Sequence, residues 1–457
     1  MQQADSMTSG ERRAAGSLAA VFAFRMLGLF MVLPVLATWG QGLAGATPLL
    51  IGVAIGAYGL TQACLQIPFG MLSDRIGRKP VIIGGLLLFA LGGLLAAQAD
   101  SIWGVIAGRV LQGAGAIAAA VMALVADLTR EQHRTKAMAM IGMSIGLSFA
   151  LAMVAGPLIA RAGGLQAVFL VTTGLALIGI LLIWKAVPTP QDVARHREAG
   201  VASGAFWPTL RNAELLRLNY GIAVLHAILM ASFVAIPLAL QEQAGLPRED
   251  HWWVYLVALL VSFVGMVPFI IYAERQRRMK RVVLGAILLL ALVQPLLWLG
   301  MHSLLAMVLL MVLYFLGFNV LEATLPSMLS KLAPAGAKGT AMGVYSTSQF
   351  LGAALGGVLG GAVYSFWGLG GVFACCGVLA LTWWMIGATM REPPYVTSFR
   401  LAVPDALMAD EALLRRILAV PGVAEAVLVA EEAAAYVKAD SKLVDRETLE
   451  QALQPAR

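Results

Sequence analysis

Long runs of apolar residues, each free of charge, recur along most of this 457-residue chain. The runs at 48–69 and 81–98, for example, contain no charged side chain. Runs of 18 or more such residues can cross ~30 Å of hydrocarbon as a helix, whereas an open sheet would leave backbone groups unsatisfied in lipid. The chain is 60% hydrophobic and only 12% charged, against about 25% charged for soluble domains. The sequence therefore predicts an α-helical polytopic membrane protein.

Twelve membrane spans are predicted from these runs. Their approximate bounds are 16–39, 48–71, 80–98, 103–127, 137–160, 165–187, 216–240, 252–273, 282–300, 303–329, 339–366 and 371–390. The five loops on the side of the N-terminus hold 18 Lys and Arg residues, whereas the six loops on the other side hold two. By the positive-inside rule, both termini and everything after the last span are expected in the cytoplasm.

The spans divide into two groups of six. A polar stretch, "PTPQDVARHREAG", lies in the predicted linker at 188–215, between bundles at 1–187 and 216–390. An internal repeat supports this division, because "QIPFGMLSDRIGRK" matches "MVPFIIYAERQRRM" at an offset of 200 residues. In that match Asp74, Arg75 and Arg78 meet Glu274, Arg275 and Arg278. Two similar six-helix halves are typical of transporters with parallel repeats.

A dense cluster of charge, "GMLSDRIGRKP", separates the second and third spans. One interpretation is a turn whose charges only hold the loop in water. Its residues also match the signature loop of the major facilitator superfamily, which the chain therefore resembles. The resemblance implies a latch that closes the cytoplasmic side in the outward-facing state. Its predicted residues are Gly70, Asp74, Arg75, Gly77, Arg78 and, at the end of the fourth span, Asp127.

Two physical features fit such a latch. Asp74 is expected near the N-terminus of the eleventh span, where the helix dipole favours an anion. Glycines repeat at four-residue spacing in that span, at Gly352, Gly356 and Gly360. Together with Gly70 they predict close approach of helices between the two halves.

The fourth and fifth spans carry further family-like motifs. "RVLQGAGA" resembles the motif around a buried arginine in proton-coupled members of the superfamily, with Arg109 and Gln112 in place. "AGPLIARAGG" resembles the antiporter motif, with Gly156 and Pro157 in place. Flanking glycines of that motif are replaced, which keeps uptake open as the direction of transport. The resemblance implies a drug/proton antiporter over residues 12–390.

Ionisable residues inside membrane spans are costly and mark functional sites. Four occur here, namely Arg25, Arg109, His226 and Glu322, in the first, fourth, seventh and tenth spans. These are the spans that line the cavity in the family, and Gln112 and Asn319 add polar groups there. Glu322 is the first choice for the proton carrier, with His226 as the second choice or as its partner. A static pairing of Glu322 with His226 or an arginine is the alternative.

After a short linker at 391–398, residues 399–457 have the composition of a soluble domain. Their pattern predicts strand, helix, strand, strand, helix, which is a ferredoxin-like order. The tail resembles a heavy-metal-associated domain, but its first loop, "AVPDALMADEALL", has no cysteine, so no metal site is predicted. We expect the tail to be a regulatory module, a partner-binding or dimerisation module, or a ligand sensor that binds a regulatory ligand or a partner, and an inert domain retained for folding is the alternative. An antiporter core with such a tail resembles the YajR-type transporters.

The leading functional hypothesis is a proton-coupled exporter of small apolar or drug-like solutes in a bacterial inner membrane. An uncoupled or proton-symporting uptake carrier is the alternative, and a non-transporting membrane sensor is a third. The expected partners are solute, protons and lipid. No nucleophile–base pairing, P-loop or metal-ligand spacing appears in the sequence, so neither an enzyme nor a cofactor is predicted. The net charge of +7 comes without a basic aromatic face, and no nucleic acid is expected.

Overall fold

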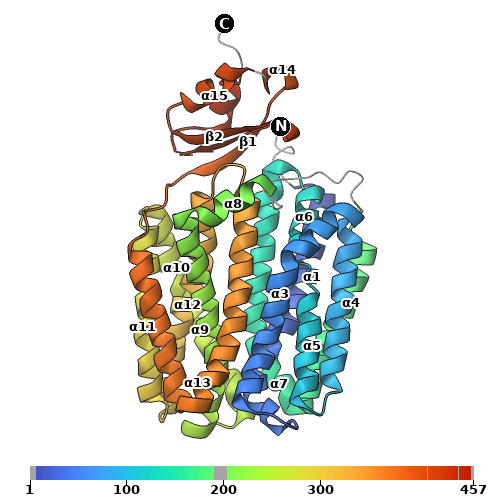
Figure 1. Ribbon diagram of the computed structural model, residues 1–457, viewed down its shortest axis with the longest axis vertical. Helices are drawn as coiled ribbons and strands as arrows, with labels where there is room; N and C mark the ends of the chain where they lie inside the picture. The colour runs from blue at the N-terminus through green and yellow to red at the C-terminus, as the bar shows by residue number, and fades with distance from the viewer. Residues whose placement is uncertain (1–6, 190–202, 409, 441, 454–457) are drawn as a thin grey trace.

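The computed structural model describes residues 7–189, 203–408, 410–440 and 442–453 as a long helical bundle with a small domain at one end (Figure 1). The helices of the first half are α1 (Ser9–Met31), α2 (Leu33–Trp39), α3 (Pro48–Ile76), α4 (Arg78–Ala97), α5 (Ile102–Ala114), α6 (Ala118–Leu128) and α7 (Glu131–Ala186). Those of the second half are α9 (Ala213–Leu238), α10 (His251–Arg275), α11 (Met279–Gly300), α12 (Leu304–Leu332) and α13 (Lys338–Ala388). Three short helical turns adjoin these helices. They are η1 (Gly40–Gly42) after α2, η2 (Ala239–Gln243) after α9 and η3 (Arg248–Asp250) before α10.

Ten helical runs in the described part of the chain are long and apolar enough to cross a membrane. Two of these runs have 51 residues each, at Lys136–Ala186 and Lys338–Ala388. A straight helix of that length would reach about 75 Å, far more than a bilayer. Each run is instead broken by a glycine in a left-handed conformation, Gly164 (φ 68°) and Gly368 (φ 62°). Each therefore crosses twice, and the predicted twelve spans are confirmed.

Both ends of the chain lie at the same end of the bundle (Figure 1). The broken turns of α7 and α13 lie at the opposite end. This agrees with the even number of spans and with the placement of both termini on one side. Residues 190–202 of the predicted linker at 188–215 lie outside the described residues, and α8 (Ser203–Arg211) occupies much of the remainder.

The two halves contact each other most closely toward the end opposite the termini. A Cβ added at Gly52 of α3 would lie 2.3 Å from the carbonyl oxygen of Gly357 in α13, and one at Gly56 would lie 2.4 Å from that of Ala354. A second contact joins Trp39 of the first half to Arg248 of the second, whose guanidinium lies 3.9 Å from the Trp39 ring centroid. Closure at this end is the arrangement expected of an inward-facing transporter.

The predicted role of one glycine stripe is wrong. Gly352, Gly356 and Gly360 do not face the first half. They pack against α9 within their own half, where Cβ atoms at Gly352 and Gly356 would lie 2.1 and 2.2 Å from the carbonyl oxygens of Ala223 and Ala227. The contact with α3 uses a second stripe of small residues on a neighbouring face of α13.

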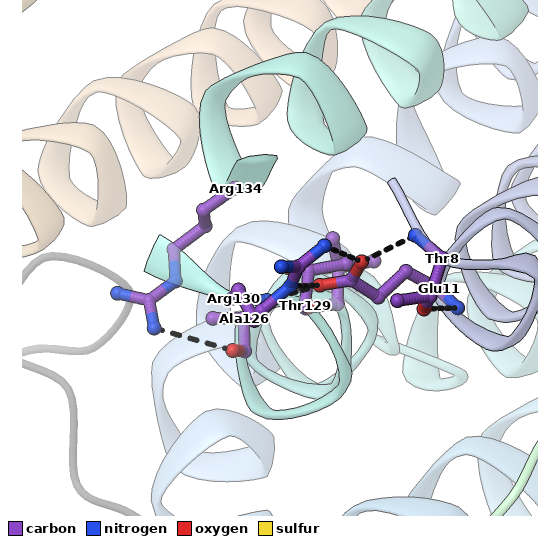
Figure 2. Close-up of polar contacts among 7 residues, drawn as sticks. Thr8, Glu11, Ala126, Thr129, Arg130 and Arg134 are labelled. Atoms are coloured by element: carbon purple, nitrogen blue, oxygen red, sulfur yellow. Dashed lines mark hydrogen bonds and ion pairs between the residues drawn. The ribbon is translucent and has the colours of Figure 1, made fainter. Parts of the chain in front are cut away.

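An ion pair ties α1 to the loop between α6 and α7 (Figure 2). Glu11 closes a capping box with Thr8 at the start of α1. Its carboxylate also accepts hydrogen bonds from the backbone N–H of Arg130, at 2.8 Å, and from that residue's guanidinium, at 2.9 Å. Nearby, Arg134 donates to the carbonyl of Ala126 at 3.3 Å. This clamp lies within the first half, so it orders the terminal end of that half without joining it to the other.

The small domain forms a three-stranded antiparallel sheet in the order β1-β3-β2. Its elements are β1 (Thr397–Ala402), α14 (Asp405–Met408), α15 (Glu411–Leu418), β2 (Val423–Val429), η4 (Ala430–Glu432), β3 (Ala434–Ala439) and α16 (Arg446–Gln451). Leu401, Leu413, Ile417, Val437 and Leu449 fill its core. The predicted strand and helix order is confirmed, with two additional short helical turns, α14 and η4.

Candidate functional site

The charged turn between α3 and α4 is organised around Arg78. Its guanidinium donates to the carboxylate of Asp74, to the hydroxyl of Ser73 at 2.8 Å and to Asp127 Oδ2 at 3.2 Å. Arg78 and Asp127 are buried, whereas the side chain of Asp74 is 39% exposed. Gly77 makes the sharp turn with φ 99°.

The remaining turn residues are exposed or pack within the first half in this conformation. Arg75 is exposed. A Cβ on Gly70 would lie 3.1 Å from Ala119 Cβ, in α6 of the same half. Among the described residues, the ion pairs of this turn all stay within the first half. The turn is therefore a preformed unit, with Asp74 accessible from the terminal end.

The first half contains two fully buried arginines that both lie close to the ring of one tyrosine. Arg25 lies 5.7 Å and Arg109 lies 5.1 Å from the ring centroid of Tyr58. Arg25 donates to Gln62 Oε1 at 2.6 Å and to the carbonyl of Gly115 at 3.0 Å. We call Arg25, Tyr58, Gln62, Arg109 and Gln112 the arginine cluster.

The partners of Arg109 in this cluster are neutral oxygens. Arg109 donates to Gln112 Oε1 at 3.1 Å and to the carbonyl of Ala54 at 3.3 Å. Gly115 lies where the fourth span is interrupted, between α5 and α6. The cluster therefore holds two cations beside a break in a membrane helix.

The second half contains the acid cluster, formed by His226, Glu322 and Gln349. Gln349 Nε2 lies 2.8 Å from His226 Nε2 and 3.4 Å from Glu322 Oε1. His226 Nδ1 lies 3.2 Å from the carbonyl of Ile222. That contact assigns the ring proton to Nδ1, so Nε2 accepts from Gln349 and the ring is neutral in this arrangement.

The side chain of Glu322 is partly buried and partly accessible to solvent. Its Oε2 atom is buried with no hydrogen-bond partner, although 38% of the side chain is exposed. Oε2 lies 3.9 Å from His226 Nε2. The carboxylate is thus within reach of a histidine while part of the side chain borders accessible space.

The four ionisable residues were expected around one cavity, but the structure divides them between two clusters. Arg25 and Arg109 lie together in the first half, and His226 and Glu322 lie together in the second. Asn319 belongs to neither, because it donates to Ser262 Oγ at 3.0 Å. The role of Gln349 was not predicted. A glutamine within the apolar eleventh span is a signal that sequence reasoning could have used.

The antiporter-like motif lies where the first and fifth spans cross. A Cβ on Gly156 would lie 2.4 Å from the carbonyl oxygen of Met31. Met31 ends α1, and the chain continues through Val32 into α2. Pro157 follows inside α7. Close packing at Gly156 therefore fixes the outer part of the first span against the fifth.

Aromatic rings from both halves meet between the bundles. Phe149 of α7 stacks on Phe318 of α12 at 5.9 Å, and lies 6.5 Å from Phe233 and 6.1 Å from Phe315. Phe318 also lies 6.0 Å from the ring of His226. An apolar, polarizable surface thus adjoins the acid cluster.

The described residues include no group of three or more His, Cys, Asp or Glu side chains able to hold a metal ion. Outside the membrane spans, burial lowers the pKa of Lys438 in β3 to about 8. Its Nζ donates to the carbonyls of Lys331 and Ala333 at the end of α12. The small domain is therefore docked directly on the second half.

Comparisons with known proteins agree with this architecture. A family model described as "Major Facilitator Superfamily" matches residues 18–357, and one described as "YajR YAM domain" matches residues 399–455. The chain is 53% identical to the inner membrane transport protein YajR of Escherichia coli (strain K12), over 98% of this chain and 99% of that protein. It is 26% identical to the multidrug resistance protein MdtH of Aeromonas hydrophila, over 75% of this chain and 85% of that protein.

Solved structures show the same fold at low sequence identity. The human organic anion transporter MFSD10 matches with a TM-score of 0.61 and 20% identity, over 83% of this chain and 100% of that one. The nucleoside transporter NupG matches with a TM-score of 0.66 and 12% identity, over 82% of this chain and 99% of that one. These two likenesses concern the fold alone.

Proposed function

The chain belongs to the major facilitator superfamily and is a multi-pass transporter of the inner membrane, and we propose that it is a proton-coupled exporter of small apolar or drug-like solutes. The similarity to a protein named for multidrug resistance supports the solute class. The acid cluster is the observation that carries the proposal.

Glu322 has the features required of a proton carrier. A carboxylate in a membrane span is costly when charged and unpaired, so its protonation responds strongly to its surroundings. Its buried Oε2 has no hydrogen-bond partner, and the exposed part of the side chain gives access to protons. His226 and Gln349 come from α9 and α13, so relative motion of these helices changes the contacts of the acid.

The aromatic cluster supports an apolar solute. Phe149 comes from the first half, whereas Phe233, Phe315 and Phe318 come from the second. A flat apolar solute can replace the ring–ring contacts between the halves when they separate. Because Phe318 adjoins His226, the solute and the proton would occupy neighbouring sites.

The charged turn serves as the latch for the opposite state. The buried pair of Arg78 and Asp127 holds the shape of the turn, and Asp74 remains half-exposed. When the terminal end closes, Asp74 can approach the positive N-terminal end of α13. Gly70, Arg75 and Gly77 complete this latch, and the Gly156–Pro157 motif supports the antiporter assignment.

Everted membrane vesicles test the proposal. With an acid interior established, ethidium, 2-naphthamide and 2-naphthoate are added in turn while the pH gradient is followed by dye fluorescence. An accepted solute should collapse the gradient in vesicles containing the native protein. Glu322→Gln should abolish that collapse, because the amide cannot carry the proton.

Glu249→Gln, on the loop opposite the termini, is the matched control and should behave as the native protein. Thermal unfolding of the purified variants checks that both are folded. Equal gradient collapse in native and Glu322→Gln vesicles would exclude Glu322 as the carrier.

A further inference from the structure

The arginine cluster has an excess of positive charge. Arg25 and Arg109 are both fully buried and both lie against the Tyr58 ring. In the described part of the chain, neither guanidinium forms an ion pair with a carboxylate. Buried charges in proteins are normally paired, and arginine stays protonated under all ordinary conditions. The two cations therefore need a negative charge that the described residues around them do not supply.

The arginine cluster also lacks hydrogen-bond acceptors. The acceptors in the cluster are neutral oxygens, from Gln62, Gln112 and the carbonyls of Ala54 and Gly115. Three buried donors have no acceptor, namely Arg25 Nε, Arg25 Nη1 and Gln112 Nε2. Unsatisfied donors on the Arg25 guanidinium and on the amide that contacts Arg109 point to an anion as the missing partner.

The surrounding helices place this cluster where a transporter binds solute. Arg25 donates to Gly115, at the interruption between α5 and α6. Interrupted membrane helices commonly form solute sites near the bilayer midplane. Tyr58 also lies 6.3 Å from Phe350 of α13, across the boundary between the halves. Phe350 follows Gln349, so the arginine cluster and the acid cluster flank the same contact.

We propose that the arginine cluster binds the anionic head of the transported solute, a carboxylate on an apolar aromatic body. This inference rests on the proposed function and narrows its solute class. The two guanidiniums supply the charge, and the Arg25 and Gln112 donors bind the carboxylate oxygens. The aromatic cluster contacts the apolar body. Because both arginines are buried in this conformation, the head enters when the Tyr58–Phe350 contact opens.

A matched series of ligands tests the proposal on the full chain in lipid nanodiscs. The probes are 2-naphthoate, 2-naphthamide and 2-naphthylmethylamine, which share the ring system and differ in charge. Affinity is measured by thermal shift and by equilibrium binding. We expect 2-naphthoate to bind at least tenfold more tightly than the amide or the amine. Arg25→Gln should reduce the affinity for 2-naphthoate at least tenfold and leave that for the amide unchanged.

Further variants separate binding from folding. Arg12→Gln, an exposed arginine in the first turn of α1 at the terminal end, is the matched control and should bind 2-naphthoate normally. Gln112→Leu removes the Nε2 donor, together with the Oε1 acceptor of Arg109, without removing charge, and it should weaken the binding of 2-naphthoate selectively. If Arg25→Gln does not fold, the affinity of Gln112→Leu for 2-naphthoate tests the proposal instead. Equal affinity for the three probes, or undiminished 2-naphthoate binding by a folded variant, would overturn the proposal.

A small inorganic anion shares the chemistry of the carboxylate, so sodium chloride is compared with sodium gluconate in the same assays. Chloride that stabilises the native protein and not Arg25→Gln, without any effect of 2-naphthoate, would overturn the assignment to the solute head. A negative result for anion binding can be distinguished from a negative result for proton-coupled export. Ethidium could still collapse the pH gradient through Glu322 while 2-naphthoate binds nowhere.

Discussion

Gln349 joins the two titratable groups of the acid cluster, with its amide nitrogen 2.8 Å from His226 and 3.4 Å from Glu322. Gln349→Leu should lower the rate of proton-coupled transport about 10- to 100-fold, the effect of losing a hydrogen bond to a charged group. The solute should bind with unchanged affinity, because the side chain acts on the acid. Rates and equilibrium binding of an accepted probe measure the two effects. A matching loss of affinity would instead assign Gln349 to the solute site.

Charge made four of these residues predictable. Arg25, Arg109, His226 and Glu322 stand out because each interrupts an apolar run. Their division into two clusters was not predictable, since a residue's place on a span does not say which neighbour its helix face meets. Neutral groups such as Gln62 and Gln349 give a weaker signal. Glutamine also occurs within these spans at sites such as Gln294, which is buried in α11 and packs near Gly377 of α13.

At the scale of elements, the contact between α3 and α13 holds the far end of the bundle closed. A Cβ at Gly52 would lie 2.3 Å from a backbone oxygen of α13. Gly52→Leu should therefore destabilise the closed end by about 1–3 kcal/mol, the usual cost of overpacking. Amide hydrogen exchange in the loop at 40–47 should become faster at fixed pH. Gly84→Leu is the control, because a Cβ there has no neighbour within 4 Å. Unchanged exchange in Gly52→Leu would mean that other contacts hold this end.

The membrane spans were predictable, because apolar length and the positive-inside bias depend on lipid and not on tertiary contacts. The early start of α1 at Ser9 and the breaks between α1 and α2 and between α5 and α6 were not predicted. The faces by which the helices pack against one another were harder to predict. α13 carries two stripes of small residues on adjacent faces, one around Gly352 and Gly356 and one around Ala354 and Gly357. Either stripe permits close approach. Only the tertiary structure selects which one meets the other half.

The charged turn occurs once in each half, at 70–80 and at 270–280, and the two copies make different contacts. Gly77 in the first copy and Arg277 in the second both adopt positive φ, at 99° and 52°. For arginine this conformation costs on the order of 1 kcal/mol. The Arg277 side chain donates to both carboxylate oxygens of Asp440 in the small domain, at 3.0 and 2.9 Å. The first copy thus serves the latch that we propose, and the second holds the small domain.

Lys438 should make this docking depend on pH. Its environment includes Glu425, which raises its pKa, and Lys338, which lowers it, but burial dominates and lowers the pKa to about 8. An undocked lysine has a pKa of about 10.4, so between these values the undocked state binds more protons. Docking should therefore strengthen as the pH rises from 8 toward 10, by up to about tenfold per pH unit. The neutral amine still has two N–H groups for the carbonyls of Lys331 and Ala333.

Distances between spin labels measure the docked fraction. Cysteines replace the exposed Arg281 and Glu447 in a background without the native Cys64, Cys375 and Cys376. The short-distance population should increase with pH in this protein and stay constant in Lys438→Met. Asp440→Asn should lower that population at every pH, because it removes the ion pair with Arg277 and leaves Lys438 in place. A docked fraction that falls as the pH rises would show that the charged form of Lys438 stabilises the contact, which reverses the effect assigned to its burial.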